Sequence, residues 1–432
     1  IKSAAEAEGV DLSRVKIEAG NQGKANIENN NLTVPKAILG AVNEIIDNIN
    51  QSGKYSYNVG LSKIDLNIKL FQPQSCRVYS SLAEGLDVYL LANMAQRLFW
   101  IDNVKAICMI GVYLLHSEAY YGFGDIQYGM LITPFYVNAF FFVSGYLMFN
   151  KYLNVSALGN NLVYVKALQN IVFRLMIPSL FFSAVMFVPK MLFHSAEVSV
   201  HAFLLHVLGG ISYWFTSALS VAQIVLLSLI MLLKRKDIWS YMWCSVLLFA
   251  LGWYLNDVRT DTSAEAFFPW FWKTGLEYTL IMALGGIYMK YKNHIHAMRH
   301  ILFTFSIVIY VISMYMLMNG MTFALMGLGG RCNIKGGILI LAGISLIVSL
   351  SHILKENRIL SYIGRNSIVF YFLSGVLPAF WGNVAQRFCP EKMYSVTIVV
   401  ATLSLLLAWV ATVVINKYLP FLIDIRKLFY EK

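Results

Sequence analysis

Charged side chains are scarce in this sequence of 432 residues: Asp, Glu, Lys and Arg together make up 13% of it, whereas 58% of the residues are hydrophobic. Soluble domains usually contain about 25% charged residues. The scarcity therefore excludes an ordinary soluble enzyme and predicts a protein that is integral to a membrane.

Cysteine is also rare, and its positions are scattered. The spacings match no metal site and no disulfide framework, so we expect neither a zinc site nor another bound metal. The opening residues lack the charged start, apolar core and cleavage site of a signal peptide, and we expect none. The five cysteines are Cys76, Cys108, Cys244, Cys332 and Cys389.

Residues 1–93 and 94–432 differ in composition, the first part being polar and rich in Asn, Lys, Glu and Ser. Within it, residues 35–49 place isoleucine and valine at helical spacing. Residues 55–71 and 81–91 fit either short strands or short helices. We therefore predict a small soluble region that is α+β or partly disordered.

Met94 would be a natural start for the apolar part. Residues 1–93 are then a fused domain, an engineered addition or a gene-boundary artefact, and the residues do not decide among these origins. They contain no recognisable catalytic motif.

Ten apolar segments follow, and most have the roughly 20 residues needed to cross a bilayer core about 30 Å thick. They predict an all-α membrane domain over residues 94–432. A further apolar stretch, 201–215, is interrupted by glycines and is predicted to be re-entrant or interfacial. The segments are 99–117, 130–149, 168–189, 214–233, 239–256, 274–290, 301–319, 336–354, 362–381 and 395–415.

The net charge of +11 reflects basic loops that follow the even-numbered segments. Basic residues occur in 234–236, 290–299, 355–358 and 417–427, whereas 118–129 has no lysine or arginine. Positive charge collects in cytoplasmic loops, so both ends of the membrane domain are predicted to be cytoplasmic, in a cell (inner) membrane. Basic cytoplasmic loops beside membrane lipids account for the excess positive charge, so we expect no nucleic-acid partner.

The first apolar segment, "IDNVKAICMIGVYLLHS", contains Asp102, Lys105 and His116. A charged side chain at the centre of a span costs roughly 2.5–3.5 kcal/mol on insertion scales. On a helix, Lys105 and His116 differ by about 20° around the axis and by about 16 Å along it. Asp102 falls within about 40° of the same line, and Met109 and Val112 lie between.

These residues form one polar stripe that must face protein or a watery cavity instead of lipid. Asp102 and Lys105, three residues apart, can partly neutralise each other. The alternative is that both are interfacial residues that extend toward water, with His116 a hydrogen-bonded histidine at the other boundary.

Residues 94–432 resemble the membrane-bound acyltransferase-3 family. Members begin their first span with Ile-Asp or Leu-Asp, followed by arginine or lysine and then by a histidine, as the first segment does here. Four later motifs occur in the family's order, and the family also has ten spans. These are "FFFVSGYLM" (140–148), "RLMIPSLFF" (174–182), "YWFTSAL" (213–219) and "YIGRNSIVFYFLS" (362–374).

The resemblance implies that an acyl group, commonly acetyl, moves from cytoplasmic acyl-CoA to a hydroxyl of a cell-surface glycan or its lipid-linked sugar precursor. Acyl-CoA is then the donor substrate, and no bound cofactor is implied. His116 is implied as the catalytic residue, either as a general base or as the site of an acyl-histidine intermediate.

The resemblance also implies an acyl-donor site made of Asp102, Lys105 and Arg174. Lys105 stands where many members have arginine, and Asp102 is expected to position it. Arg174 is suited to the phosphates of CoA, the alternative being an interfacial anchor. Many members have a second arginine three residues earlier, where this chain has Ile171.

Further polar residues are candidates for substrate contact, each with a structural alternative. Ser144, beside Gly145, is expected to allow close approach of two helices rather than to act as a nucleophile. Glu118 would orient His116 only if the helix ended first, because positions two apart do not face each other. The candidates are Glu118, Ser144, Trp214, Glu277, Asn366 and Tyr371. Ser374 stands where many relatives have histidine.

Two other functions compete with this interpretation. A transporter or flippase of a lipid-linked or small anionic substrate would also place polar residues along a span, although no internal repeat is visible. A membrane sensor would use residues 1–93. His294, His296 and His300 lack accompanying carboxylates, and the glycine-rich stretch 327–337 lacks the ending of a phosphate loop, so neither indicates a site.

Overall fold

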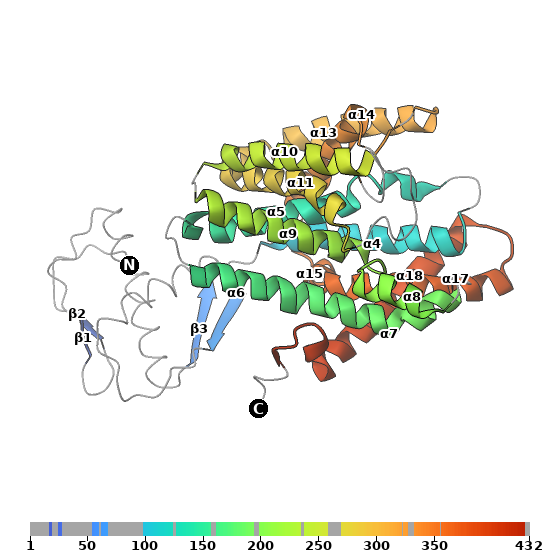
Figure 1. The fold of residues 1–432 in the computed structure, drawn as a ribbon, viewed down its shortest axis with the longest axis horizontal. Helices are drawn as coiled ribbons and strands as arrows, with labels where there is room; N and C mark the ends of the chain where they lie inside the picture. The colour runs from blue at the N-terminus through green and yellow to red at the C-terminus, as the bar shows by residue number, and fades with distance from the viewer. Residues whose placement is uncertain are drawn as a thin grey trace. The chain divides into compact units, whose positions relative to one another are not determined.

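A computed structural model gives the architecture of the chain (Figure 1). Contacts divide it into two units, residues 1–97 and 98–432, and each is considered by itself. The structure describes strand residues between 17 and 67, and residues 98–427 with gaps. The gaps are 124–126, 157–160, 194–197, 235–236, 258–268, 322, 327–331 and 355.

The first unit contains two antiparallel hairpins. Strand β1 (Ile17–Ala19) pairs with β2 (Ala25–Ile27), and β3 (Lys54–Val59) pairs with β4 (Ser62–Asn67). The second hairpin overlaps the stretch 55–71 that fitted either strands or helices, and its described residues there form strands. The predicted helix over 35–49 and the stretch 81–91 lie outside the described residues.

The second unit is a bundle of helices that run alongside one another (Figure 1). In its described part, eight stretches are long and apolar enough to cross a membrane, and a bent pair of helices makes a ninth. Six of the eight are single helices: α4 (Phe99–Tyr120), α9 (Trp214–Leu233), α10 (Ile238–Asp257), α13 (Arg299–Met318), α14 (Ile334–Ile353) and α18 (Tyr394–Tyr418).

Helix α11 (Trp272–Lys290) matches the sixth predicted segment, 274–290. It is less apolar than the others because it contains Lys273, Glu277 and Lys290. It nevertheless has 19 residues and packs against α5, α9 and α10. A helix buried among its neighbours can carry polar residues that a lipid-facing one cannot. Each of the ten predicted segments therefore lies on helical structure in the part of the chain that the structure describes, and the predicted all-α membrane fold is confirmed.

Two spans are less regular than predicted. The second combines η1 (Tyr128–Leu131) with α5 (Tyr136–Ser156). The third runs through α6 (Asn161–Ile171), the π-helical turn η2 (Val172–Met176) and α7 (Ile177–Phe193). Single π-turns inside α-helices often mark functional sites.

The ninth predicted segment, 362–381, is broken. It overlaps α15 (Arg358–Arg365), α16 (Ser367–Leu373) and α17 (Leu377–Phe388), with a 44° bend between the last two. Asn366 separates the first two helices. The apolar pattern predicted the segment but not its breaks, because hydropathy does not reveal where backbone hydrogen bonding is interrupted.

The stretch 201–215, predicted to be re-entrant or interfacial, is mostly short helical turns that lead into α9. It forms α8 (Val200–Phe203) and the π-helical turn η3 (Leu204–Leu208), together nine residues and so about 13.5 Å long. The chain then turns at two glycines into α9: Trp270 N–H donates to the Gly209 carbonyl, and the Ser217 hydroxyl donates to the Gly210 carbonyl. Gly210 has φ of +76°, which favours glycine.

Ion pairs and hydrogen bonds between separate segments identify the two ends of the bundle. The basic end holds the start of α4 and the end of α18, together with α12 (Lys292–Ala297) and η5 (Pro420–Leu422). The far end holds the end of α4 and the start of α18. At the basic end the pairs are Asp102–Arg365, Arg174–Asp424 and Lys290–Asp237; at the far end they are Glu118–Gly129, Tyr121–Glu391 and Asn256–Glu277.

Helices α5 and α11 pack at backbone distance because of glycine. A Cβ on Gly145 would overlap the backbone of Met282, and a Cβ on Gly285 would overlap the carbonyl oxygen of Phe142. Small residues allow such close approach between spans. The predicted structural role of the Ser144–Gly145 pair is thus visible in the packing.

We expect Gly285→Ala to destabilise the protein, because neither backbone can move aside. Overpacking of this kind typically costs about 1–3 kcal/mol. The measurement is the thermal unfolding midpoint in detergent. Gly337→Ala is the matched control, since its Cβ would meet only Cys332 Sγ at 3.9 Å. Equal midpoints for the two variants would contradict the packing described.

Candidate functional site

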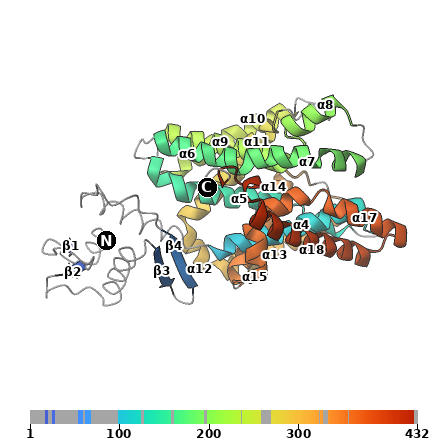
Figure 2. The same cartoon turned by 90° about the horizontal axis from the view of Figure 1, so that it is seen from below.

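The polar stripe predicted on α4 lines two successive cavities. Lys105 and Met109 line the first, and Val112 and His116 line the second. We call them the basic-end cavity and the far-end cavity. Helix α4 and α16 form one side of both cavities, and α9 forms the other; Figure 2 shows the row of α4, α17 and α18 apart from that of α6, α7 and α9. The stripe therefore faces cavities within protein.

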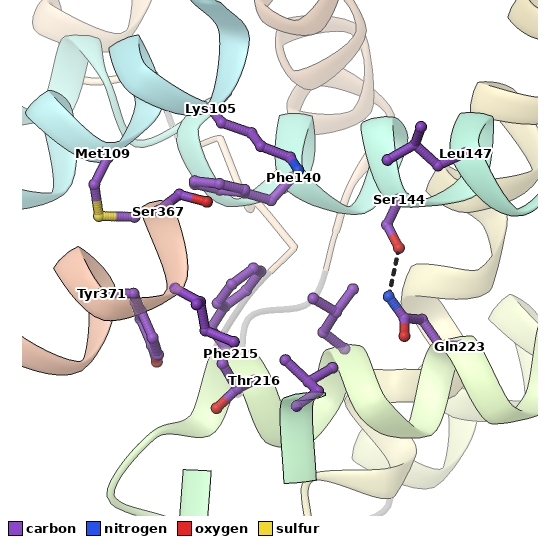
Figure 3. Close-up of a pocket in the computed structure, with 13 residues that line it drawn as sticks. Lys105, Met109, Phe140, Ser144, Leu147, Phe215, Thr216, Gln223, Ser367 and Tyr371 are labelled. Carbon is purple, nitrogen blue, oxygen red and sulfur yellow. Dashed lines mark hydrogen bonds between the residues drawn. The ribbon is translucent and has the colours of Figure 1, made fainter. Parts of the chain in front are cut away.

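The basic-end cavity has a volume of about 190 Å³ and is drawn in Figure 3. Lys105 extends from α4 toward α5 across its upper wall in that view. On the opposite side, Gln223 of α9 donates a hydrogen bond of 2.7 Å to the Ser144 hydroxyl of α5. Ser144 is thus held by an amide, with no base beside it, which fits a binding group rather than a nucleophile. Met109, Phe140, Leu147, Leu175, Leu219 and Ile368 supply most of the apolar lining.

The far-end cavity is larger, at about 390 Å³, and His116 is half-buried in its wall. The imidazole stacks on Tyr120, with ring centroids 6.1 Å apart and an interplanar angle of 17°. Trp214 and Ser374, both named from the sequence, also line this cavity. The Ser374 hydroxyl donates to the Tyr371 carbonyl within its own helix.

Three aromatic rings separate the two cavities and line both of them: Phe140, Phe215 and Tyr371. The Phe215 ring lies between the other two, with centroids 5.3 Å from Phe140 and 5.2 Å from Tyr371. We call this trio the aromatic partition. It is the aromatic part of the lining that the two cavities share.

Asp102 lies at the start of the stripe, 6% exposed. Its Oδ2 is 3.9 Å from Nε of Arg365 on α15. Gly364 permits this arrangement, because a Cβ there would overlap the Asp102 backbone. The carboxylate thus faces α15 as well as its own helix, and Arg365 joins the basic end of the site.

Arg174 lies on the π-turn η2, one residue before Leu175 of the basic-end cavity. Its Nε donates a 2.9 Å hydrogen bond to Asp424, in the turn that follows α18. The guanidinium is anchored on one edge while its side chain is 66% exposed.

Glu118 and Glu277 lie outside both cavities. The carboxylate of Glu118 accepts from the Gly129 N–H at 2.8 and 3.0 Å, which ties the end of α4 to η1. Glu277 accepts from Asn256 between α10 and α11. Both carboxylates make contacts between chain segments, and contact of either one with a substrate stays a prediction.

Asn366 joins helices. Its amide donates to the Tyr362 carbonyl, and its oxygen accepts from Asn416 of α18, both at 2.8 Å. The neighbouring Ser367 lines the basic-end cavity, and Tyr371 one turn later lines both cavities. Of the two roles considered for Asn366, the contacts support the structural one.

Sequence reasoning missed Gln223, Arg365, Asp424 and Arg426. Gln223 was detectable as an amide inside an otherwise apolar segment, and Arg365 as a cation next to Asn366 in a motif already noted. Asp424 and Arg426 gave no such signal, because their partners on the third span are about 250 residues away in the chain.

Comparison with known proteins gives one finding. The family model described as an acyltransferase domain matches residues 98–416, which is most of the second unit. No curated protein and no solved structure matches the chain.

We expect the aromatic partition to divide the two cavities for solutes as well. In a chain with its native cysteines replaced, Ser144→Cys should react with a membrane-impermeant thiol reagent added at the basic end, and Thr133→Cys, in the far-end cavity, with reagent added at the opposite face. A chain that keeps only Cys108, which is fully buried, should react from neither side. Equal reaction of both variants from one side would contradict the partition.

Proposed function

The chain belongs to the acyltransferase-3 family and is a membrane acyltransferase, and from this premise we propose that it transfers an acetyl group from acyl-CoA to a glycan hydroxyl. The acceptor is a cell-surface glycan or its lipid-linked sugar precursor. The observation that carries the proposal is the stripe on α4, which puts Lys105 in one cavity and His116 in the other.

The donor enters at the basic end. This end is cytoplasmic in the proposal, because positive residues favour that side and acyl-CoA is a cytoplasmic substrate. Arg174 offers an exposed guanidinium to the phosphates, for which its planar fork is suited. Lys105 offers an ammonium to the carbonyl or a phosphate oxygen, as a point charge. Asp102 and Arg365 support the charge balance around it.

The far-end cavity receives the acceptor. Its volume lies within the range of about 300–1,000 Å³ that small-molecule sites usually have, whereas the basic-end cavity is smaller. A narrow cavity suits the thin thioester arm of the donor. A wider cavity beside a half-buried histidine suits a sugar hydroxyl.

The transfer step uses His116 as the base. Its neutral imidazole takes the proton of the acceptor hydroxyl while the oxygen attacks the thioester carbonyl carbon. The tetrahedral intermediate collapses, the carbon–sulfur bond breaks, and the imidazolium returns the proton to the departing sulfur. The products are an ester on the acceptor and free CoA, and the base is regenerated. With an acyl-histidine intermediate, the same overall reaction would take two steps: acylation of His116 with release of CoA, and then transfer of the acyl group to the acceptor hydroxyl.

The reacting groups meet only if the acyl group passes the aromatic partition. Lys105 and His116 are eleven residues apart on one helix, about 16 Å. In the proposal, the cavities are joined by rotation of the Phe215 ring, whose centroid is 5.3 Å from that of Phe140 and 5.2 Å from that of Tyr371. The partition also limits the size of the acyl group, which supports a short chain such as acetyl.

We expect His116→Ala to reduce transfer of label from acetyl-CoA to envelope glycan by roughly 10²–10⁴-fold, the usual contribution of a general base. Inside-out vesicles with labelled acetyl-CoA provide the measurement. His300→Ala is the control, since His300 is exposed on α13 and lines neither cavity.

Equal labelling by wild type and His116→Ala would contradict the role of His116. If wild-type vesicles consumed no acetyl-CoA with any glycan, the acyltransfer proposal would fail, and flux of a lipid-linked sugar would be the function to measure. Comparison of O-acetyl groups on glycans from cells with and without the chain identifies the acceptor.

A further inference from the structure

The turn that follows α18 folds back onto the third span. After Tyr418 the chain forms η5, and Asp424 then lies 6% exposed against η2. Both segments belong to the second unit and lie at the basic end. The sequence showed these residues only as part of a basic tail, so this contact assigns them a place in the fold.

One carboxylate holds two guanidiniums. Arg426 donates to Asp424 from Nε to Oδ1 and from Nη2 to Oδ2, each at 2.7 Å. Arg174 donates from Nε to Oδ2 at 2.9 Å. The group of three residues therefore carries one net positive charge.

The carboxylate stays ionised at neutral pH. The hydrogen bonds from Arg426 first, and from Arg174 in addition, lower the pKa of Asp424 to about 2, against the raising effect of its burial. Asp424 therefore remains a permanent anion between the two cations.

Arg426 also contacts the third span directly, at the end of α6 and in the π-turn. Its Nη1 donates to Asn170 Oδ1 at 2.8 Å, and its guanidinium carbon lies 5.6 Å from the centre of the Phe173 ring. Its donors are thus largely used within the protein. Arg174, in contrast, uses Nε alone: among the described residues its terminal nitrogens make no hydrogen bond, and its side chain is 66% exposed.

We infer that Asp424 and Arg426 are positioning residues that hold Arg174 as the binding group for the phosphates of the CoA donor. Asp424 fixes the orientation of the Arg174 guanidinium. Arg426 neutralises Asp424, so that the charge of Arg174 remains available to an anion. This inference rests on the proposed function and extends its donor site to the C-terminal turn.

The net charge of the three-residue group distinguishes this role from a purely structural one. Without Arg426, Asp424 would neutralise Arg174, and the site would have no net charge for phosphate. Removing the charge of Asp424 as well would return the net charge to +1, even though still more hydrogen bonds are lost. A structural role predicts the opposite order, because each lost bond weakens the turn further.

The test is the affinity of the purified full chain for CoA, measured for wild type, Arg426→Gln, Arg426→Lys and the double variant Asp424→Asn/Arg426→Gln. We expect Arg426→Gln to bind CoA roughly tenfold more weakly, the loss of about one charge-assisted hydrogen bond. Arg426→Lys, which keeps the charge, should bind more tightly than Arg426→Gln, and the double variant should recover most of the lost affinity. Thermal unfolding midpoints establish that each variant is folded.

Wild-type affinity in Arg426→Gln would overturn the inference, as would a double variant that binds no better than Arg426→Gln. If wild type itself bound no CoA, the proposed function would fail and this inference with it. A wild type that binds CoA with unchanged variants would remove the inference alone.

Discussion

The structure depends on one constraint: charged and polar side chains within a membrane span must face protein or water. Helix α4 carries three of them on one line, and the bundle is arranged around that line. Helices α5, α9 and α16 complete two cavities beside it, so that Lys105 and His116 each have a cavity to face. Without those cavities, the charged side chains of the stripe would face hydrocarbon, at a free-energy cost that nothing offsets.

The backbone departs from the regular α-helix near the candidate site. The π-turn at Arg174, the break at Asn366 and the glycine turn before α9 all lie beside a cavity or beside residues that line one. In contrast, the α5–α11 contact is as close as backbones allow, at Gly145 and Gly285. Rigid packing thus surrounds segments whose backbone departs from the α-helix, which is the arrangement a positioned site requires.

The membrane spans and the polar stripe on α4 were predictable from the sequence, because both follow from the regular spacing of residues along a helix. Hydropathy located ten spans, and the helical repeat put Asp102, Lys105 and His116 on one face, because both depend only on residues near one another in the chain. The break in segment 362–381 was not predictable in this way. Contacts between separate segments were also invisible: Glu118 accepts a hydrogen bond from Gly129, and Arg174 meets Asp424 after a separation of 250 residues.

The central claim is that donor and acceptor occupy opposite ends of one path along α4. Sealed inside-out vesicles test it most directly, with labelled acetyl-CoA supplied only at the outer, cytoplasmic face and the envelope glycan enclosed in the lumen. The account predicts that label reaches the enclosed glycan while free CoA remains outside. Labelling only of glycan added to the same side as acetyl-CoA would contradict it.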